Sequence, residues 1–154
     1  MIYIGADHRG FGLKESLKRF LTKNRIPFED FGAAKLDPSD DFIDYALPVA
    51  KAVATDPVMH RGILMCGSGV GMDIAANKVR GVRAALVRSV HQAIGSRKDD
   101  DANVLVFDAD ETSGADAADI VQVWLSTPFS NEPRYRNRLD KLAALEQEMF
   151  SPNK

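Results

Sequence analysis

The amino-acid sequence predicts an α/β protein with three layers, in which helices cover both faces of a five-stranded parallel sheet. Short apolar runs rich in β-branched residues alternate with segments whose apolar residues recur at helical spacing over the 154 residues. The runs are apolar throughout, as strands buried on both faces are, and the segments between them are long enough for the helical crossovers that parallel strands need. These two observations predict the fold class.

The first half of the chain contains three predicted strands, which are short apolar segments at residues 2–6, 27–31 and 62–65. After the first strand, a helix at 12–24 places Leu13, Leu17 and Leu21 on one face. A polar, proline-containing loop at 32–40 then leads into a helix at 42–55. We expect this loop on the side of the sheet where ligands bind.

Residues 63–78 join a strand end, three glycines and the start of a helix. Gly67, Gly69 and Gly71 free the backbone to turn sharply, and helical spacing resumes at residues 73–78. Such a turn directs backbone N–H groups at whatever lies above the strand end. An anion, or an oxyanion that develops during a reaction, is the natural ligand there.

The second half of the chain continues the alternation. We expect a strand at 82–87, a helix at 89–96, a strand at 103–107 and a helix at 115–126. The last helix, at residues 133–150, has no strand after it, yet its leucines need to be covered. We therefore expect it to pack on a partner subunit, and a monomer with the helix folded back is the alternative.

Length and composition favour a single domain, 1–154, in which 45% of the residues are hydrophobic. A formal net charge of −2 argues against a surface for nucleic acid or anionic membrane. No apolar run approaches membrane-spanning length, and the chain begins with strand-like residues instead of a leader, so we expect a cytoplasmic protein. One cysteine cannot form an internal disulfide, and three scattered histidines give no metal-ligand spacing.

Ligands of parallel α/β sheets bind beyond the carboxyl ends of the strands, so the residues that follow the predicted strands are candidates for a site. These residues are Asp7 and His8, the stretch 66–71, Arg88, and the stretch 108–110. We expect them to converge on one crevice.

Cys66 follows a strand and precedes the glycine-rich turn. A free cysteine is usually a small buried hydrophobic residue, but a thiol at a strand end that faces a helix start can serve as a proton acceptor or nucleophile. Ser68 can donate a hydrogen bond to a substrate oxygen or cap the following helix. The residues alone leave both alternatives open.

Two further groups have both a structural and a functional interpretation. Asp7 and His8 form either a solvent-facing turn or part of the crevice, where a histidine can hold phosphate or move a proton. Arg134 and Arg138 share one face of the last helix at i and i+4 spacing. They form either a solvated basic face or a clamp for a phosphate or carboxylate.

Five blocks of sequence, in this order, carry a resemblance to a known family. They are residues 5–10, 66–71 with 74–78, 101–105, 126–129, and the pair Arg134 and Arg138. Together they resemble the sugar-phosphate isomerases of the ribose-5-phosphate isomerase B and galactose-6-phosphate isomerase family. The resemblance spans nearly the whole chain. It implies a doubly wound, Rossmann-like fold, a homodimer or tetramer with sites shared between subunits, and no metal or organic cofactor.

The resemblance also implies roles for individual residues. Cys66 resembles the base that removes the proton beside the carbonyl, with a cis-enediol as intermediate. The loop that holds the enediolate oxygens matches Gly67, Ser68, Gly69, Val70 and Gly71. Asp7 and His8 resemble substrate-contacting residues, and His8, Arg134 and Arg138 resemble the phosphate site, with the arginines reaching across the dimer.

The chain departs from the family pattern at one end of the expected site. Typical members have histidine, the acid that opens the sugar ring, followed by asparagine, where this chain has Asp99 and Asp100. Asp99 can replace that acid only if burial or a neighbouring carboxylate raises its pKa, and Asp100 then stands at a substrate-binding position. Three other positions also differ from the family pattern. This chain has Asp110 where many members have arginine, Phe42 where they have tyrosine, and Tyr135 where they have histidine.

The first hypothesis is therefore an aldose–ketose isomerase of a phosphorylated sugar, either ribose 5-phosphate or a related sugar phosphate of four to six carbons. A substrate without a stable ring, such as a tetrose phosphate, would remove the need for the ring-opening histidine. The alternative from another class is a non-catalytic protein that binds or senses a sugar phosphate.

Overall fold

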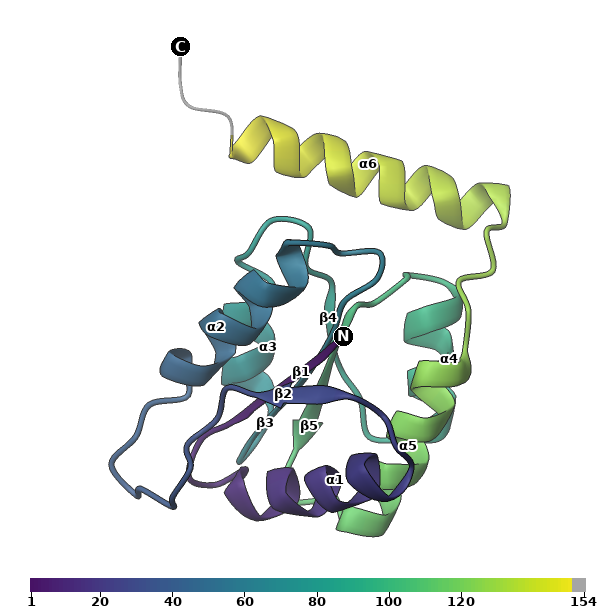
Figure 1. The fold of residues 1–154 in the computed structure, drawn as a ribbon. Coiled ribbons are helices and arrows are strands. Elements are labelled where there is room, and N and C mark those ends of the chain that lie inside the picture. Colours follow the sequence, from purple (N-terminus) through teal and green to yellow (C-terminus); the bar gives the residue numbers. More distant parts are fainter. Residues whose placement is uncertain (151–154) are drawn as a thin grey trace.

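The structure, a computed structural model, describes residues 1–150 and consists of a five-stranded sheet between two layers of helices, with a last helix standing outside them (Figure 1). The strands are β1 (Ile2–Ala6), β2 (Phe28–Asp30), β3 (Arg61–Cys66), β4 (Ala84–Leu86) and β5 (Val104–Asp108). The helices are α1 (Phe11–Lys23), α2 (Ile43–Ala54), α3 (Val70–Ala76), α4 (Val90–Lys98), α5 (Gly114–Ser126) and α6 (Pro133–Met149). The predicted fold class and order of elements are confirmed.

The sheet is parallel throughout, with strand order β2-β1-β3-β5-β4. From β1 the chain passes through α1 to β2 at one edge, and it then returns through α2 to β3 on the other side of β1. The strand order therefore reverses between β1 and β3. In a doubly wound sheet, the crevice at the carboxyl ends of two such strands is where ligands bind.

Alternate residues of each strand enter two separate cores, one on each face of the sheet. Ile63 and Met65 of β3 pack with Trp124 in the core under α1, α4 and α5. Leu64 and Cys66 point to the opposite face, into the core under α2 and α3. Because side chains alternate along a strand, this register fixes which helices surround Cys66.

Most element boundaries differ from the sequence-based expectation by one or two residues, and two of the differences have a clear local cause. Helix α3 begins at Val70, three residues earlier than expected, because Gly69 takes a left-handed conformation (φ +76°) and forms the N-cap itself. Strand β4 is shorter than the expected 82–87, because the backbone N–H of Arg83 donates to the Asn103 side chain (2.8 Å) instead of a strand partner.

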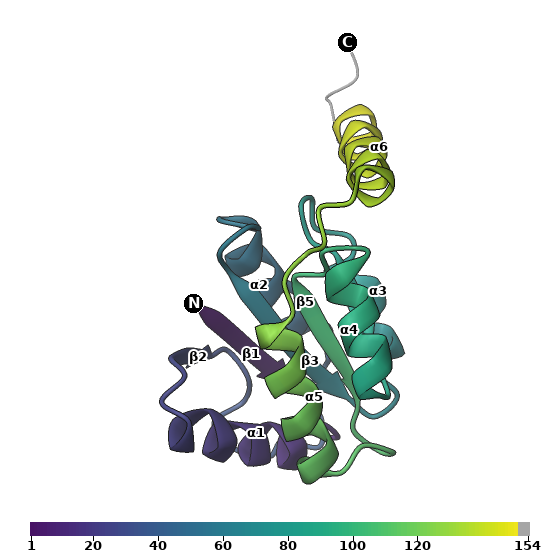
Figure 2. The same ribbon diagram turned by 90° about the vertical axis from the view of Figure 1, so that its right-hand side faces the viewer.

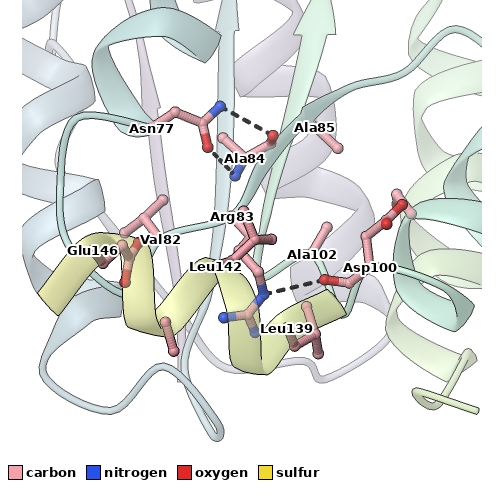
Figure 3. A pocket seen from close by; sticks show the side chains of 12 residues that line it. Asn77, Val82, Arg83, Ala84, Ala85, Asp100, Ala102, Leu139, Leu142 and Glu146 are labelled. Atoms are coloured by element: carbon pink, nitrogen blue, oxygen red, sulfur yellow. Dashed lines mark hydrogen bonds between the residues drawn. The ribbon is translucent and has the colours of Figure 1, made fainter. Parts of the chain in front are cut away.

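Helix α6 stands apart from the two layers in both views (Figures 1 and 2). None of its residues is buried, and Leu142 and Leu145 are 49% and 52% exposed. Its Glu146 carboxylate accepts the Gly81 N–H at 3.1 Å. A cavity of about 400 Å³ separates it from the start of β4 (Figure 3).

Within residues 1–150, no helix combines the length and apolar character needed to cross a bilayer.

Candidate active site

Three side chains form a row across the carboxyl ends of β3, β5 and β4. Cys66 is paired in register with Asp108, so the two side chains lie on the same face of neighbouring strands. The Arg88 guanidinium donates to Asp108 Oδ2 at 3.0 Å from the end of β4. Cys66 and Asp108 are only 6% and 4% exposed, so these two side chains are built into the sheet, whereas Arg88 lies at its surface.

The glycine-rich loop at residues 67–71 fits closely over this row. A Cβ on Gly69 would collide with Leu86 and the Phe107 carbonyl, and one on Gly71 would lie 3.0 Å from the Phe42 ring. The segment after β5 fixes the start of the loop, since the Ala109 N–H donates to the Cys66 carbonyl at 2.9 Å. Side chains larger than hydrogen at these positions would displace the loop.

Ser68 lies in the exposed part of this loop. Its Oγ accepts the Val70 N–H at 3.3 Å, while the N-cap position of α3 belongs to Gly69. The serine hydroxyl therefore supports the turn without acting as the N-cap, and its proton remains available to an oxygen above the loop.

Asp7 and His8 both occupy the turn after β1. Asp7 is buried and accepts the Gly10 N–H at 2.9 Å, which closes the turn. The Asp40 Oδ1 atom accepts both the backbone N–H of His8 (2.9 Å) and its ring Nδ1 (2.7 Å). Among the described residues the ring Nε2 has no partner, so this nitrogen is available to a ligand.

An ion pair between Arg9 and Asp110 crosses the start of the glycine-rich loop. The Arg9 guanidinium lies against Gly67, so closely that a Cβ there would collide with it. Asp110 is fixed in turn by the donation of its N–H to the Gly67 carbonyl at 3.1 Å. The carboxylate at this changed family position therefore has its charge balanced by Arg9.

Three buried carboxylate oxygens around this crevice have no hydrogen-bond partner among the described residues. They are Asp40 Oδ2, Asp73 Oδ1 and Asp108 Oδ1. Burial raises the pKa of Asp73, although a hydrogen bond from the Leu86 amide opposes the shift. Buried polar atoms are nearly always paired in folded proteins, so the orphaned acceptor of Asp108, at the end of β5, indicates a place for a donor from a ligand or another chain.

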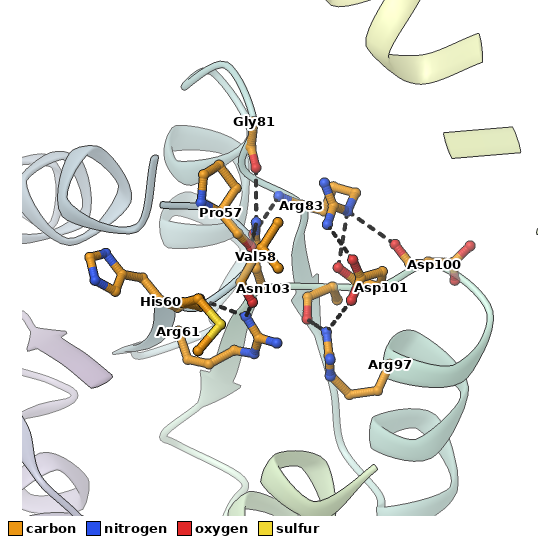
Figure 4. Close-up of polar contacts among 12 residues, drawn as sticks. Pro57, Val58, His60, Arg61, Gly81, Arg83, Arg97, Asp100, Asp101 and Asn103 are labelled. Carbon is orange, nitrogen blue, oxygen red and sulfur yellow. Dashed lines mark hydrogen bonds and ion pairs between the residues drawn. The ribbon is translucent and has the colours of Figure 1, made fainter. Parts of the chain in front are cut away.

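Asp99 and Asp100 lie at the opposite end of the sheet, after α4 and before β5. A polar cluster holds this segment (Figure 4), in which Asp101 accepts from Arg83 (2.9 Å) and Arg97 (2.7 Å). The Asp100 carbonyl also accepts from Arg83 at 3.1 Å. The segment is therefore fixed at the amino ends of the strands, beneath α6.

The arginines predicted to bind phosphate belong to this second group. Arg134 and Arg138 lie at 5.2 and 5.4 Å from the centre of the Tyr135 ring, and both are exposed. Partial burial and the neighbouring Asp99 raise the pKa of Asp100, and Arg138 lowers it in part. Arg138 and Asp100 are thus close enough to interact.

Within one chain, the predicted residues form two groups instead of one site. Asp7, His8, Cys66 and the glycine-rich loop lie together, whereas Asp99, Asp100, Arg134 and Arg138 lie together elsewhere. Strand β3 has six residues, so at about 3.3 Å per residue its two ends are about 17 Å apart. A single chain cannot bring both groups to one sugar phosphate.

Three residues of the crevice had no assigned role in the sequence-based site: Asp40, Arg9 and Asp108. Asp40 lies in the polar loop expected near ligands, and Arg9 follows His8 in the first family block. The sequence therefore offered a reason to consider both as site residues. Asp108 was expected only as one of several strand-end residues, because strand register is not readable from one sequence.

Within residues 1–150, no three His, Cys, Asp or Glu side chains are grouped to hold a metal ion.

Comparison with known proteins gives one consistent result. The profile of a family described as Ribose/Galactose Isomerase matches residues 2–142. Ribose-5-phosphate isomerase B of Mycolicibacterium paratuberculosis is 36% identical over 98% of this chain and 94% of its own length. The crystal structure of ribose-5-phosphate isomerase B from Mycoplasma genitalium with bound ribulose-5-phosphate has a TM-score of 0.92 at 37% identity, covering 96% of both chains. That of the Clostridium thermocellum enzyme has a TM-score of 0.90 at 38% identity, covering 96% of this chain and 98% of its own.

Proposed function

The chain belongs to the ribose/galactose isomerase family and is an aldose–ketose isomerase, and we propose that it interconverts ribose 5-phosphate and ribulose 5-phosphate with Cys66 as the base. One observation carries this proposal. Cys66 is held at the end of β3, at the crevice where the strand order reverses, directly before a loop whose conformation requires glycine.

In the proposed reaction, the Cys66 thiolate removes the proton from the sugar carbon beside the carbonyl and returns it to the neighbouring carbon. The cis-enediolate between these steps carries negative charge on its oxygens. Amides at the start of α3 have no partner within the helix, and Ser68 offers a hydroxyl proton. Preorganised donors of this kind contribute several kcal/mol to transition-state stabilisation.

A homodimer completes the proposed site. The amino-end group of one subunit, with Asp100, Arg134 and Arg138, then lies over the crevice of its partner. The uncovered leucines of α6 support this assembly, because an apolar face that is exposed in one chain needs cover from another. His8 and the two arginines bind the phosphate, and Arg134 and Arg138 suit this role because guanidinium groups match phosphate geometry. A tetramer made of two such dimers is compatible with this arrangement.

We assign ring opening to Asp100, where the sequence alone favoured Asp99 in the place of the family histidine. Partial burial and the charge of Asp99 raise the pKa of Asp100, so it keeps its proton to higher pH than an ordinary aspartate. Only the protonated carboxyl can donate to the ring oxygen. Ring opening is therefore expected to slow as the pH rises through this raised pKa.

A tetrose phosphate is the second candidate substrate, because carboxylates replace the histidine and asparagine that typical members carry. Turnover of four-, five- and six-carbon aldose phosphates distinguishes the two candidates. A clear preference for ribose 5-phosphate supports the first. A preference for the four-carbon substrate, which has no stable ring to open, supports the second.

The base is tested by replacing Cys66 with alanine and following deuterium exchange at C2 of the aldose phosphate in heavy water. We expect exchange and turnover to fall about 100- to 10,000-fold, the usual contribution of general acid–base catalysis, with an unchanged circular dichroism spectrum. Undiminished exchange would refute the assignment of the base. A wild-type protein that binds sugar phosphate without any exchange would instead be a non-catalytic binding protein.

A further inference from the structure

Asp108, at the end of β5, has a buried carboxylate whose two oxygens differ in their surroundings. Its side chain is only 6% exposed, and its Oδ2 atom pairs with Arg88. Its Oδ1 atom is buried without a hydrogen-bond partner. Leaving a buried acceptor unpaired destabilises the folded state, so a second role is needed to explain its position.

Register places Asp108 beside the proposed base. Cys66 and Asp108 are opposite each other on β3 and β5, and neighbouring strands are about 4.8 Å apart. Among the described residues, no hydrogen bond joins the thiol to this carboxylate. Neither group is therefore occupied by the other, and each can act on a different atom of a substrate.

The other two orphaned carboxylates lie in different settings. Asp73 is on α3 and accepts the Leu86 amide, so it faces β4. Asp40 holds His8 through its other oxygen. Only Asp108 combines an unpaired oxygen with a position next to Cys66.

The chemistry of the isomerisation requires a second proton carrier. As the aldose becomes a ketose, one proton moves from C2 to C1, and another moves from the hydroxyl on O2 to the former carbonyl oxygen O1. Cys66 can carry only the first. In a cis-enediol both oxygens lie on the same side, so a single carboxylate can reach both of them.

We propose that Asp108 carries the hydroxyl proton between O2 and O1, which extends the proposed function of this site. When the Cys66 thiolate takes the C2 proton, the C1 carbonyl electrons move to O1. Asp108 Oδ1 takes the O2 proton and delivers it to O1. The C2 carbonyl then forms, and the Cys66 thiol gives its proton to C1. Both groups end ionised as they began, and Arg88 balances the carboxylate charge throughout.

The test compares Asp108→Asn with the wild type in heavy water, using ribose 5-phosphate and measuring both turnover and C2 deuterium in the unreacted sugar. Asparagine keeps the shape of the side chain but cannot take the proton. We expect turnover to fall about 100-fold or more, with the ratio of exchange to turnover rising at least about 10-fold, because the enediolate forms and returns to substrate. Asp119→Asn, the same change at an exposed position of α5, is the control and is expected to keep both rates.

Two results would overturn the proposal. Exchange and turnover that fall equally would show that Asp108 acts through binding or through the position of Cys66. Rates within about twofold of the wild type would show no role in the reaction. If Asp108→Asn fails to fold, Asp108→Ser is measured in the same way, because the smaller serine side chain fits into the space that the aspartate occupies. The Cys66→Ala variant tests the proposed base separately from the proposed role of Asp108. Deuterium exchange that persists in Cys66→Ala would refute Cys66 as the base, independently of the result for Asp108.

Discussion

The two ends of the sheet are built in different ways. At the carboxyl end, Cys66 and Asp108 are each more than 90% buried and placed by strand register. At the amino end, Arg134 and Arg138 are exposed on a helix that buries none of its residues. The residues proposed to transfer protons are therefore positioned by the fold of one chain, whereas those proposed to bind phosphate and open the ring would reach them only through a partner subunit. A substitution at one end can therefore perturb that end and leave the other intact.

The largest effect is expected from Leu142→Glu, which places a charge on the uncovered face of α6. A carboxylate buried in a subunit contact is costly, so the protein should become monomeric and lose activity at least about 100-fold. Sedimentation velocity measures the assembly, and circular dichroism should show the helices and sheet preserved. The same added charge on α1, in Thr22→Glu, is the control. A dimer that survives Leu142→Glu would contradict the assembly through α6.

A smaller loss is expected from Arg138→Ala. Hydrogen bonds between charged groups contribute about 1.5–3 kcal/mol each, which corresponds to a decrease of about 10- to 100-fold in kcat/KM. Arg136→Ala is the matched control, because Arg136 donates to Asn131 at 3.1 Å instead and lies on another face of α6. Equal losses in both variants would show that the effect is one of general charge.

At the other end, Gly69→Ala is expected to lower the free energy of unfolding by about 1–3 kcal/mol, because its φ of +76° and its contact with Leu86 exclude a Cβ. Gly95→Ala is the control, since a Cβ there meets no atom within 4 Å. A helix interior gains about 0.5–1 kcal/mol from alanine over glycine. Urea unfolding measures both variants, and equal stabilities would show that the loop does not require glycine.

The smallest effect concerns the pH dependence of stability. Burial raises the folded-state pKa of Asp73, so the folded protein holds this proton to higher pH than the unfolded chain. The resulting stability is present below the ordinary aspartate pKa and is lost as the pH rises through the raised one. Asp73→Asn should therefore weaken the decline of stability in this window, as followed by urea unfolding from pH 3 to 7. An unchanged profile would contradict the shift.

The fold was predictable from the sequence because periodicity and turn residues act locally. The apolar runs predicted the strands, and the glycines at positions 67, 69 and 71 predicted the turn after β3. The start of α3 was predicted three residues late, because the conformation of Gly69 depends on the ends of β4 and β5, which are distant in sequence.

The site was predictable in its residue types but not in its arrangement. Cys66 and His8 were predicted as site residues from strand ends and family blocks. The separation of Arg138 from Cys66 within one chain depends on where α6 lies relative to the sheet. The polar residues of α6 do not predict that position. The role proposed for Asp108 depends on its register with Cys66, and register depends on pairing between strands that are far apart in the chain.

Complementation between two inactive variants tests the central claim, that each active site combines the carboxyl end of one chain with the amino end of another. Cys66→Ala and the double variant Arg134→Ala/Arg138→Ala are purified, mixed, dissociated and reassociated. Random pairing makes half of the dimers hybrid, each with one intact site of two, so we expect about a quarter of wild-type activity. A mixture that stays as inactive as its components, although sedimentation shows hybrid dimers, would contradict a site shared between subunits.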